Sequence, residues 1–414
     1  MRRFGSASFG TAVLIWSGLA AALTAAPRQS RTFGEDVAFL KEHTEVILLS
    51  HGTGEAEVVV APQYQGRVMT STTGGAEGPS YGWIHREAIA SGRRQAHINV
   101  FGGEDRFWLG PEGGQYSIFF KAGDPFDLEH WQVPEPIDWG PWEVVSQSGE
   151  QVRFRQTMTL INHSGTRFEL RVDRTVRLLG AADLIEHLPV KAGSHHLLDG
   201  RVVAFESANT ITNTGSEPWR KETGLLSIWI LGMFNPTPRT TVVIPFKAGP
   251  EVEKGPAVND AYFGKVPGDR LAVGRDVLFF RGDGEHRSKI GIARPRARPI
   301  MGSYDGANRV LTLVQYTLPP EAVDYVNSMW EIQDRPYRGD VVNSYNDGPP
   351  EPGRPPLGPF YELESSSPAA ALAPGESLTH VHRTIHLEGP EAELDRIARA
   401  TLGIGLARIT NAFK

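Results

Sequence analysis

The feature that most constrains this chain is a pair of long segments in which apolar and polar residues alternate. Residues 151–161 read QVRFRQTMTLI and residues 166–179 read TRFELRVDRTVRLL, and the turn-forming NHSG lies between them. Alternation with a period of two is typical of a strand that buries one face, and polar clusters with glycine separate such strands. These residues therefore predict two strands of an antiparallel sheet.

Similar segments run through the rest of the chain. Further strands are predicted at residues 45–50, 56–62, 67–72, 201–213, 224–234, 240–246, 276–282, 288–293, 308–318, 358–366 and 377–389. Helices are expected at residues 35–43 and near residues 390–402, where Pro390 stands at the first turn and Gly403 follows the last. Many closely spaced strands predict an all-β fold, a large antiparallel β-sandwich with a few short helices. We expect one domain over residues 27–414.

The first 26 residues form a predicted signal peptide. Arg2 and Arg3 precede the apolar run FGTAVLIWSGLAAAL, and TAAPRQS then offers small residues for cleavage near Ala25 or Ala26. This run is shorter than the roughly 20 residues that a membrane-spanning helix needs. An uncleaved anchor is the alternative. We expect a periplasmic or secreted protein with no membrane association after removal of the signal.

Composition excludes several kinds of site. The 414 residues contain no cysteine, so disulfides, thiolate metal sites and a cysteine nucleophile are excluded. The net charge is −6 and the basic residues are scattered, so nucleic acid is not expected as a partner. His380, His382 and His386 share one face of a predicted strand, but their spacing offers no third metal ligand. We therefore expect no metal and no cofactor.

A glycine-rich stretch, FGGEDRFWLGPEGGQYSIFF over residues 101–120, combines aromatic with charged side chains. Glycine lets a ligand approach the backbone closely, and an aromatic surface with a polar rim suits a sugar ring. The stretch therefore predicts part of a sugar pocket. The alternative is a glycine-rich turn with a structural salt bridge between Asp105 and Arg106. The substrate-binding candidates here are Glu104, Asp105, Arg106, Trp108 and Gln115.

A second stretch, around residues 345–364, contains a pair of glutamates. Residues 345–347 are expected in a loop, and Glu362 and Glu364 then alternate with Tyr361 and Leu363. On a strand both carboxylates face one side. Burial of two like charges raises one pKa, which suits a general acid or base near neutral pH. The alternative is a solvent-facing strand edge.

Four further residues complete the set of candidates. Asn209 and Asn346 are candidate substrate-binding residues, as is Trp229, although an aromatic side chain on a strand is more often part of the core. His97 lies shortly before the pair Gly102-Gly103 and is a candidate catalytic group that points into the same pocket.

Several of these segments resemble the galactose mutarotase-like (aldose 1-epimerase-like) superfamily. The resemblance rests on APQYQGRVMTST, HINVFGGEDR, ITNTGSEPW, GPFYELESSSPA and LAPGESLTHVHRTIHL, spread over roughly residues 45–390. It implies a β-supersandwich with a carbohydrate ligand. It also implies that Glu362 is the general base that takes the proton of the anomeric hydroxyl, and it adds Arg67 of the Gly-Arg pair to the substrate-binding candidates.

The chain departs from the family where the acid histidine is expected. That region reads GLLSIWILGMFNP, with Ser227 and Trp229 in place of a histidine. Mutarotation needs an acid and a base on opposite sides of the ring oxygen and the anomeric hydroxyl. His97, His195 or His196 would have to supply the acid.

Three functions therefore stay open. The first is a carbohydrate-active enzyme that acts at or near an anomeric carbon. A glycoside hydrolase would need two carboxylates about 5–10 Å apart, for which Glu362 with Glu104 or Asp105 is the candidate pair, and a polysaccharide lyase would need a Tyr or His base. The second is a non-catalytic sugar-binding module, and the third is a structural β-sandwich.

Overall fold

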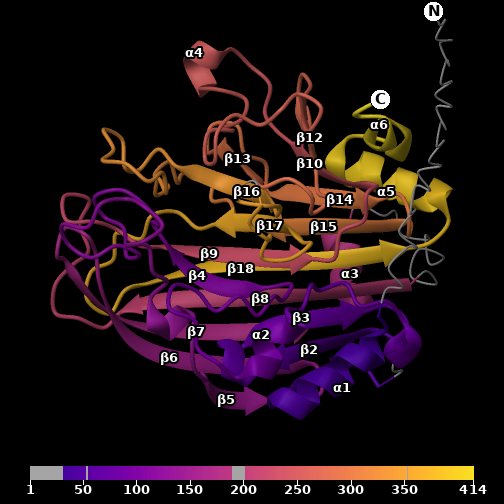
Figure 1. The fold of residues 1–414 in the computed structure, drawn as a ribbon, viewed down its shortest axis with the longest axis horizontal. Coiled ribbons are helices and arrows are strands. Elements are labelled where there is room, and N and C mark those ends of the chain that lie inside the picture. The colour runs from indigo at the N-terminus through magenta and orange to yellow at the C-terminus, as the bar shows by residue number, and fades with distance from the viewer. Residues whose placement is uncertain (1–30, 53–54, 189–200, 352) are drawn as a thin grey trace, which may run out of the picture. The chain divides into compact units, whose positions relative to one another are not determined.

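A ten-stranded and a five-stranded antiparallel sheet pack face to face in the computed structural model (Figure 1). The structure describes residues 31–52, 55–188, 201–351 and 353–414. The predicted signal peptide and both His195 and His196 lie outside these residues. Residues Arg31–Lys414 form one compact unit.

The ten-stranded sheet has the strand order β11-β12-β10-β14-β15-β18-β8-β7-β6-β5. Its longest strands are β6 (Gln151–Ile161), β7 (Arg167–Leu178), β8 (Arg201–Asn213) and β18 (Ser377–Glu388). The others are β5 (Glu143–Gln147), β10 (Thr240–Pro245), β11 (Leu271–Val273), β12 (Val277–Arg281), β14 (Ile300–Asp305) and β15 (Val310–Tyr316). β6 and β7 alternate between buried and more exposed residues, as their sequences predict.

The five-stranded sheet has the order β13-β16-β17-β9-β4. It consists of β13 (Ser288–Ala293), β16 (Asp340–Asn346), β17 (Tyr361–Ser366), β9 (Ser227–Phe234) and β4 (Arg106–Gly110). A third, small sheet contains β1 (Ile47–Ser50), β2 (Glu57–Ala61) and β3 (Arg67–Thr72). All strand pairs in the three sheets are antiparallel, so the predicted all-β sandwich is confirmed.

The helices are short and lie outside the two large sheets. They are α1 (Phe33–His43), α2 (Arg86–Ser91), α3 (Ala181–His187), α4 (Glu251–Lys254), α5 (Glu391–Leu402) and α6 (Leu406–Thr410), with 3₁₀ turns at Pro62–Tyr64, Gly75–Glu77 and Glu135–Ile137. Pro390 is the N-cap of α5 rather than a residue of its first turn, and Gly403 ends the helix in the left-handed conformation. Leu394 and Ile397 lie in the buried face of α5, beside β10 and β14 (Figure 1).

One predicted loop is a strand. Residues 345–347 were expected to be a loop, but Tyr345 and Asn346 end β16. Every residue of β16 is buried, so the strand has no exposed face to produce an alternating pattern, and its polar residues resemble a loop sequence.

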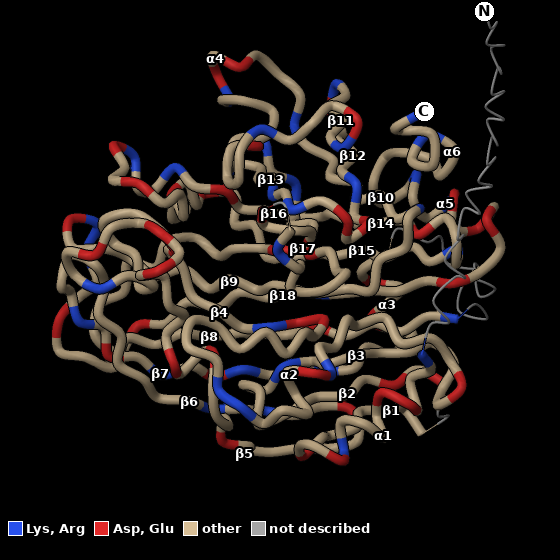
Figure 2. The backbone as a smooth tube through the Cα atoms, in the orientation of Figure 1, with Lys and Arg blue, Asp and Glu red and all other residues tan. Residues whose placement is uncertain are grey.

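Charged residues of both signs are interspersed along the described chain (Figure 2). No helix of the described residues is long and apolar enough to cross a membrane.

Candidate functional site

The outer face of the five-stranded sheet, which is turned away from the ten-stranded sheet, has a dense set of polar side chains. Directly opposed residues of antiparallel strands share a face. Glu362 of β17 is opposed by Tyr345 of β16 and Met233 of β9, and Glu364 is opposed by Asn343. Glu362 and Glu364 therefore lie on one face, as the sequence predicts.

The neighbours of these two glutamates face the interior of the sandwich. Tyr361 shares a hydrogen bond of 2.8 Å with Ser303 of β14, and Leu363 is fully buried in the core between the sheets. Tyr361 and Leu363 therefore point into the sandwich, and the two carboxylates project from the opposite face.

Glu362 is paired with Arg106 from the glycine-rich stretch. Arg106 Nη2 lies 3.3 Å from Glu362 Oε1, and its guanidinium stacks 4.0 Å above the ring of Trp108. Glu362 is only 5% exposed. Burial, with a smaller contribution from the charge of Glu364, raises its pKa to about 8, although Arg106 and Lys289 oppose the rise. The raised pKa that the sequence predicts for one carboxylate of the pair is found here.

Glu364 is held by two donors from neighbouring strands. Lys289 Nζ of β13 lies 3.0 Å from Glu364 Oε2, and Trp229 Nε1 of β9 donates to the same oxygen over 2.9 Å. The ammonium of Lys289 also lies 4.6 Å from the centre of the Trp229 ring and 5.5 Å from that of Tyr262. Burial alone would lower the pKa of Lys289, but the charges of Glu364, Glu112 and Glu362 outweigh it and raise the pKa.

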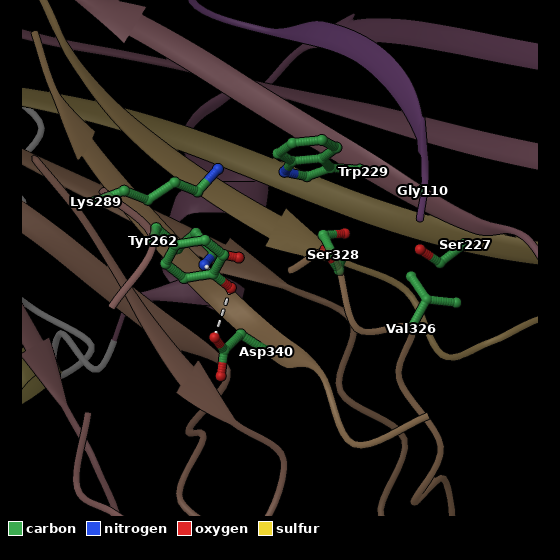
Figure 3. A pocket seen from close by; sticks show the side chains of 10 residues that line it. Gly110, Ser227, Trp229, Tyr262, Lys289, Val326, Ser328 and Asp340 are labelled. Atoms are coloured by element: carbon green, nitrogen blue, oxygen red, sulfur yellow. Dashed lines mark hydrogen bonds between the residues drawn. The ribbon is translucent and has the colours of Figure 1, made fainter. Parts of the chain in front are cut away.

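A narrow slot opens beside Lys289 (Figure 3). The centre of a water-sized sphere can occupy about 10 Å³ of the slot. The slot therefore has room for about one water molecule. Tyr262 Oη donates to Asp340 Oδ2 over 2.7 Å on one wall. The slot is lined by Gly110, Ser227, Trp229, Tyr262, Lys289, Val326, Ser328, Asp340, Asn343 and Ser366.

Val326 and Ser328 belong to the segment between β15 and β16, residues 317–339, which covers the slot. Gln115 holds this segment, because its amide group donates to Gln333 O and accepts from Gln333 N, each over 2.9 Å. Gln115 thus acts on the covering segment in this structure.

Four buried polar atoms on this sheet face have no hydrogen-bond partner within the described part of the chain. They are Glu364 Oε1, Ser227 Oγ, Arg106 Nε and Trp108 Nε1. An unpaired buried polar group costs about 1–3 kcal/mol, so such atoms mark a position for water or for a polar ligand.

Glu104 and Asp105 lie in the interior, on the other side of β4 from Arg106. Glu104 accepts hydrogen bonds from Ser71 Oγ and, over 2.8 Å, from His386 Nε2. Asp105 forms an ion pair of 2.6 Å with Arg174, so the alternative of an Asp105–Arg106 salt bridge is not what the structure contains. No contact joins either carboxylate to Glu362 among the described residues. Their assignment to a ligand stays a prediction.

Asn209 belongs to the same interior network. Its Oδ1 accepts from Arg174 Nη1 over 2.6 Å and its Nδ2 donates to Ser207 Oγ over 2.9 Å. Arg67 is also buried, where it donates to Gly102 O over 2.9 Å. Burial, with the neighbouring charge of Arg106, lowers the pKa of Arg67 to about 9. Both residues have protein partners, and their predicted role toward a sugar remains untested.

Asn346 and His97 lie away from the glutamate pair. Asn346 Oδ1 accepts from Gly284 N over 2.8 Å, and its amide donates to His286 O over 3.0 Å, so it fixes a turn. His97 is exposed, and its Nδ1 lies 2.7 Å from Trp131 O. His97 lines a second, open hollow of about 620 Å³ together with Arg94, Gln95, Ala96, Lys121, Asp124, Glu129, His130 and Gln132.

Two buried histidines of β18 bond to a serine of β17. Ser365 Oγ lies 2.8 Å from His380 Nε2 and 2.8 Å from His382 Nδ1. Burial lowers the pKa of His380 to about 3 and that of His382 to about 4, so both are neutral near pH 7. No group of three or more His, Cys, Asp and Glu side chains that could hold a metal occurs in the described ranges.

The sequence missed three residues of this site. Lys289, Tyr262 and Asp340 are brought together only by the pairing of β13 with β16 and by the loop between α4 and β11, which contains Tyr262. Lys289 in SKIGIA could have been found from the sequence, because it is the single charged residue in an otherwise mostly apolar strand. Nothing in the sequence marks Tyr262.

Comparison with known proteins identifies the family of this chain. The profile of a family described as a family of unknown function (DUF6786) matches residues 31–413. A search of curated proteins finds no match.

Several solved structures are similar to this chain at low sequence identity. A putative aldose 1-epimerase from Escherichia coli K12 is 14% identical, with 83% of this chain and 98% of that chain covered and a TM-score of 0.47. A galactose mutarotase-like protein from Lactobacillus casei is 12% identical, with 83% and 100% covered and a TM-score of 0.46. A putative mutarotase from Salmonella typhimurium is 10% identical, with 84% and 92% covered and a TM-score of 0.47.

Proposed function

The chain belongs to DUF6786, a family of unknown function, and we propose that it is a carbohydrate-active protein whose sugar pocket lies on the outer face of the five-stranded sheet. One observation supports this most. Two carboxylates (Glu362, Glu364) and two cations (Arg106, Lys289), each buried, meet beside indole rings on a single sheet face. These groups come from strands that are far apart in the sequence.

The side chains of this face match the chemistry of a sugar. The indole rings of Trp108 and Trp229 suit the apolar C–H side of a pyranose ring. A sugar would have to displace Arg106 and Lys289 from the ring faces that they contact in this structure. Carboxylate oxygens, an ammonium and a guanidinium suit its hydroxyl groups. Sugar hydroxyls could also bond to Ser227 Oγ and Glu364 Oε1, which have no hydrogen-bond partner among the described residues.

Glu362 is the proposed general base. With a pKa of about 8 it exchanges a proton near neutral pH, which is the range in which a base is most useful. Its ionised form would take the proton of an anomeric hydroxyl, while Arg106 at 3.3 Å holds the carboxylate in place. The superfamily resemblance of the sequence assigns the same role to Glu362.

Access of a sugar ring requires movement, because the slot has room for about one water molecule. The proposal therefore includes displacement of residues 317–339, which cover the slot and are tied down by Gln115.

We place this function in the periplasm or outside the cell, because the first 26 residues have the pattern of a signal peptide. N-terminal sequencing of protein from the native host should find a start near Pro27. An intact Met1 on soluble protein would contradict this location.

A thermal-shift screen of aldoses, uronates and oligosaccharides tests the proposal, since a ligand that binds the folded state raises Tm. Sugars that raise Tm are then tested for conversion at the anomeric carbon by NMR exchange spectroscopy. Glu362→Gln should lower kcat by about 10²–10⁴-fold and leave binding largely intact. Glu186→Gln, which removes an exposed carboxylate of α3, is the control. Full turnover by Glu362→Gln would place the base elsewhere.

A non-catalytic sugar-binding module is the second candidate. It is favoured by the absence of any histidine from the contacts of Glu362 among the described residues. The same screen separates the two, because a binding module raises Tm with a sugar and converts none.

A further inference from the structure

Lys289 is a buried cation, and its ammonium has N–H donors that are not bonded to an acceptor among the described residues. It is 7% exposed, and of its three N–H donors one is used by Glu364 Oε2 at 3.0 Å, the one acceptor bonded to Nζ within the described residues. The ammonium lies between the rings of Trp229 and Tyr262 and lines the slot (Figure 3). Two N–H donors therefore remain for a group in the slot.

Lys289 stands across the sheet face from Glu362. Lys289 is opposed by Tyr345 and Tyr345 is opposed by Glu362, so their backbones lie two strand spacings apart, roughly 10 Å. Both side chains project from the same face of the sheet. Lys289 lines the slot and Glu362 does not, so the opened pocket has to place a carbon atom that bears two oxygens between them, with one oxygen within about 2.7–3.2 Å of each group.

The other hydroxyl groups beside the slot carry no charge. Tyr262 Oη donates to Asp340 at 2.7 Å, and Ser227 Oγ has no hydrogen-bond partner among the described residues. Lys289 is thus the group on this face that combines a formal charge, free donors and access to the slot.

We propose that Lys289 is the proton donor to the sugar ring oxygen and acts opposite Glu362. This inference rests on the proposed function. The Glu362 carboxylate takes the proton of the anomeric hydroxyl, a C1=O bond forms, and the bond between C1 and the ring oxygen breaks as that oxygen takes a proton from Lys289 Nζ. Rotation about C1–C2 and reversal of these steps close the ring and return both protons, so no co-reactant is consumed.

The carboxylates around Lys289 keep it protonated, because Glu364, Glu112 and Glu362 raise its pKa. An ammonium in this place also stabilises negative charge that develops on the ring oxygen. It would fill the role of the acid histidine that is missing from residues 224–236 of this chain.

The test follows freshly dissolved α-D-glucose and α-D-galactose by polarimetry with purified mature protein. Lys289→Met should lower the rate by about 10²–10⁴-fold, the usual effect of losing a general acid. Lys289→Arg keeps the charge and the bond to Glu364 but cannot give up its proton, so it should bind sugar and lose most of the turnover. Lys254→Met, which removes a half-buried lysine that donates to Ala248 O, is the matched control.

Lys289→Met leaves Glu364 buried without its cation, so the double variant Lys289→Met/Glu364→Gln is measured as well, because it removes both charges together. Wild-type turnover in Lys289→Arg, with loss of turnover in Glu362→Gln, would overturn the role of Lys289 and leave the proposed function standing. No turnover of either sugar by the wild-type protein would overturn this inference, and binding of another sugar would still support the pocket.

Discussion

The charge state of Glu362 can be read from stability as well as from activity. Glu362→Gln keeps the shape of the side chain and makes it permanently neutral. In the folded protein burial and Glu364 raise the pKa of Glu362 from 4.5 to about 8, whereas the unfolded chain has the ordinary value. Between these two values the folded state holds a proton that the unfolded state has released.

The sign and the size of the effect follow from this difference. The contribution of Glu362 to stability is fully present below pH 4.5 and is lost as the pH rises through 8. The pKa of Glu362 is 4.5 in the unfolded chain and about 8 in the folded protein. Each difference of one in pKa corresponds to about 1.4 kcal/mol, so the loss amounts to about 5 kcal/mol. Because Glu364 lies two residues further along the strand, the titration belongs to the pair.

Urea unfolding of the wild-type protein and of Glu362→Gln at pH 5, 6, 7 and 8 measures this loss. Relative to the wild-type protein, the variant should become more stable by about 1.4 kcal/mol for each increase of one in pH. The titration of groups that do not interact with Glu362 cancels in the difference. Glu331→Gln, an exposed control, should give a flat difference. Parallel curves for the wild-type protein and Glu362→Gln would refute the raised pKa.

Three further predictions concern the surroundings of the site. Arg174→Met leaves Asp105 buried and unpaired, so the free energy of unfolding in urea should fall by about 3–5 kcal/mol; a fall below about 1 kcal/mol would contradict the pairing. A Cβ at Gly291 would lie 2.0 Å from Asp340 Oδ2, so Gly291→Ala should cost about 1–3 kcal/mol and weaken sugar binding in calorimetry; an unchanged affinity and stability would show that the slot wall is pliable. Burial lowers the pKa of His380 to about 3, so the unfolded state binds more protons in acid, and the wild-type protein should lose about 2 kcal/mol relative to His380→Asn between pH 7 and pH 5; an opposite trend in urea unfolding would exclude a neutral histidine.

The sequence predicts the strands that have one exposed face. β6, β7, β8 and β18 show alternation because water contacts one side of the ten-stranded sheet, and their predicted bounds differ little from the observed ones. β9 and β10 are buried throughout and were predicted from their apolar runs. β4 and β16 are equally buried but were not predicted, because β4 lies in a glycine-rich stretch and β16 has the polar sequence DVVNSYN.

The site could be predicted in part. Glu362 and Glu364 were found because two carboxylates at i and i+2 on a strand share a face whatever the tertiary structure. The role of Arg106 depends on the pairing of β4 with β9, which placed it beside β17. Glu104 and Asp105, its neighbours in the sequence, bond to residues of the interior, and only the tertiary structure reveals these partners.

A structure of the protein with the sugar that most raises its Tm tests the central claim most directly. The account predicts a ring over the outer face of the five-stranded sheet, with a hydroxyl within about 3 Å of Glu362 and with residues 317–339 displaced from the slot. A sugar bound only in the open hollow beside His97, with Glu362 and Lys289 untouched, would contradict it.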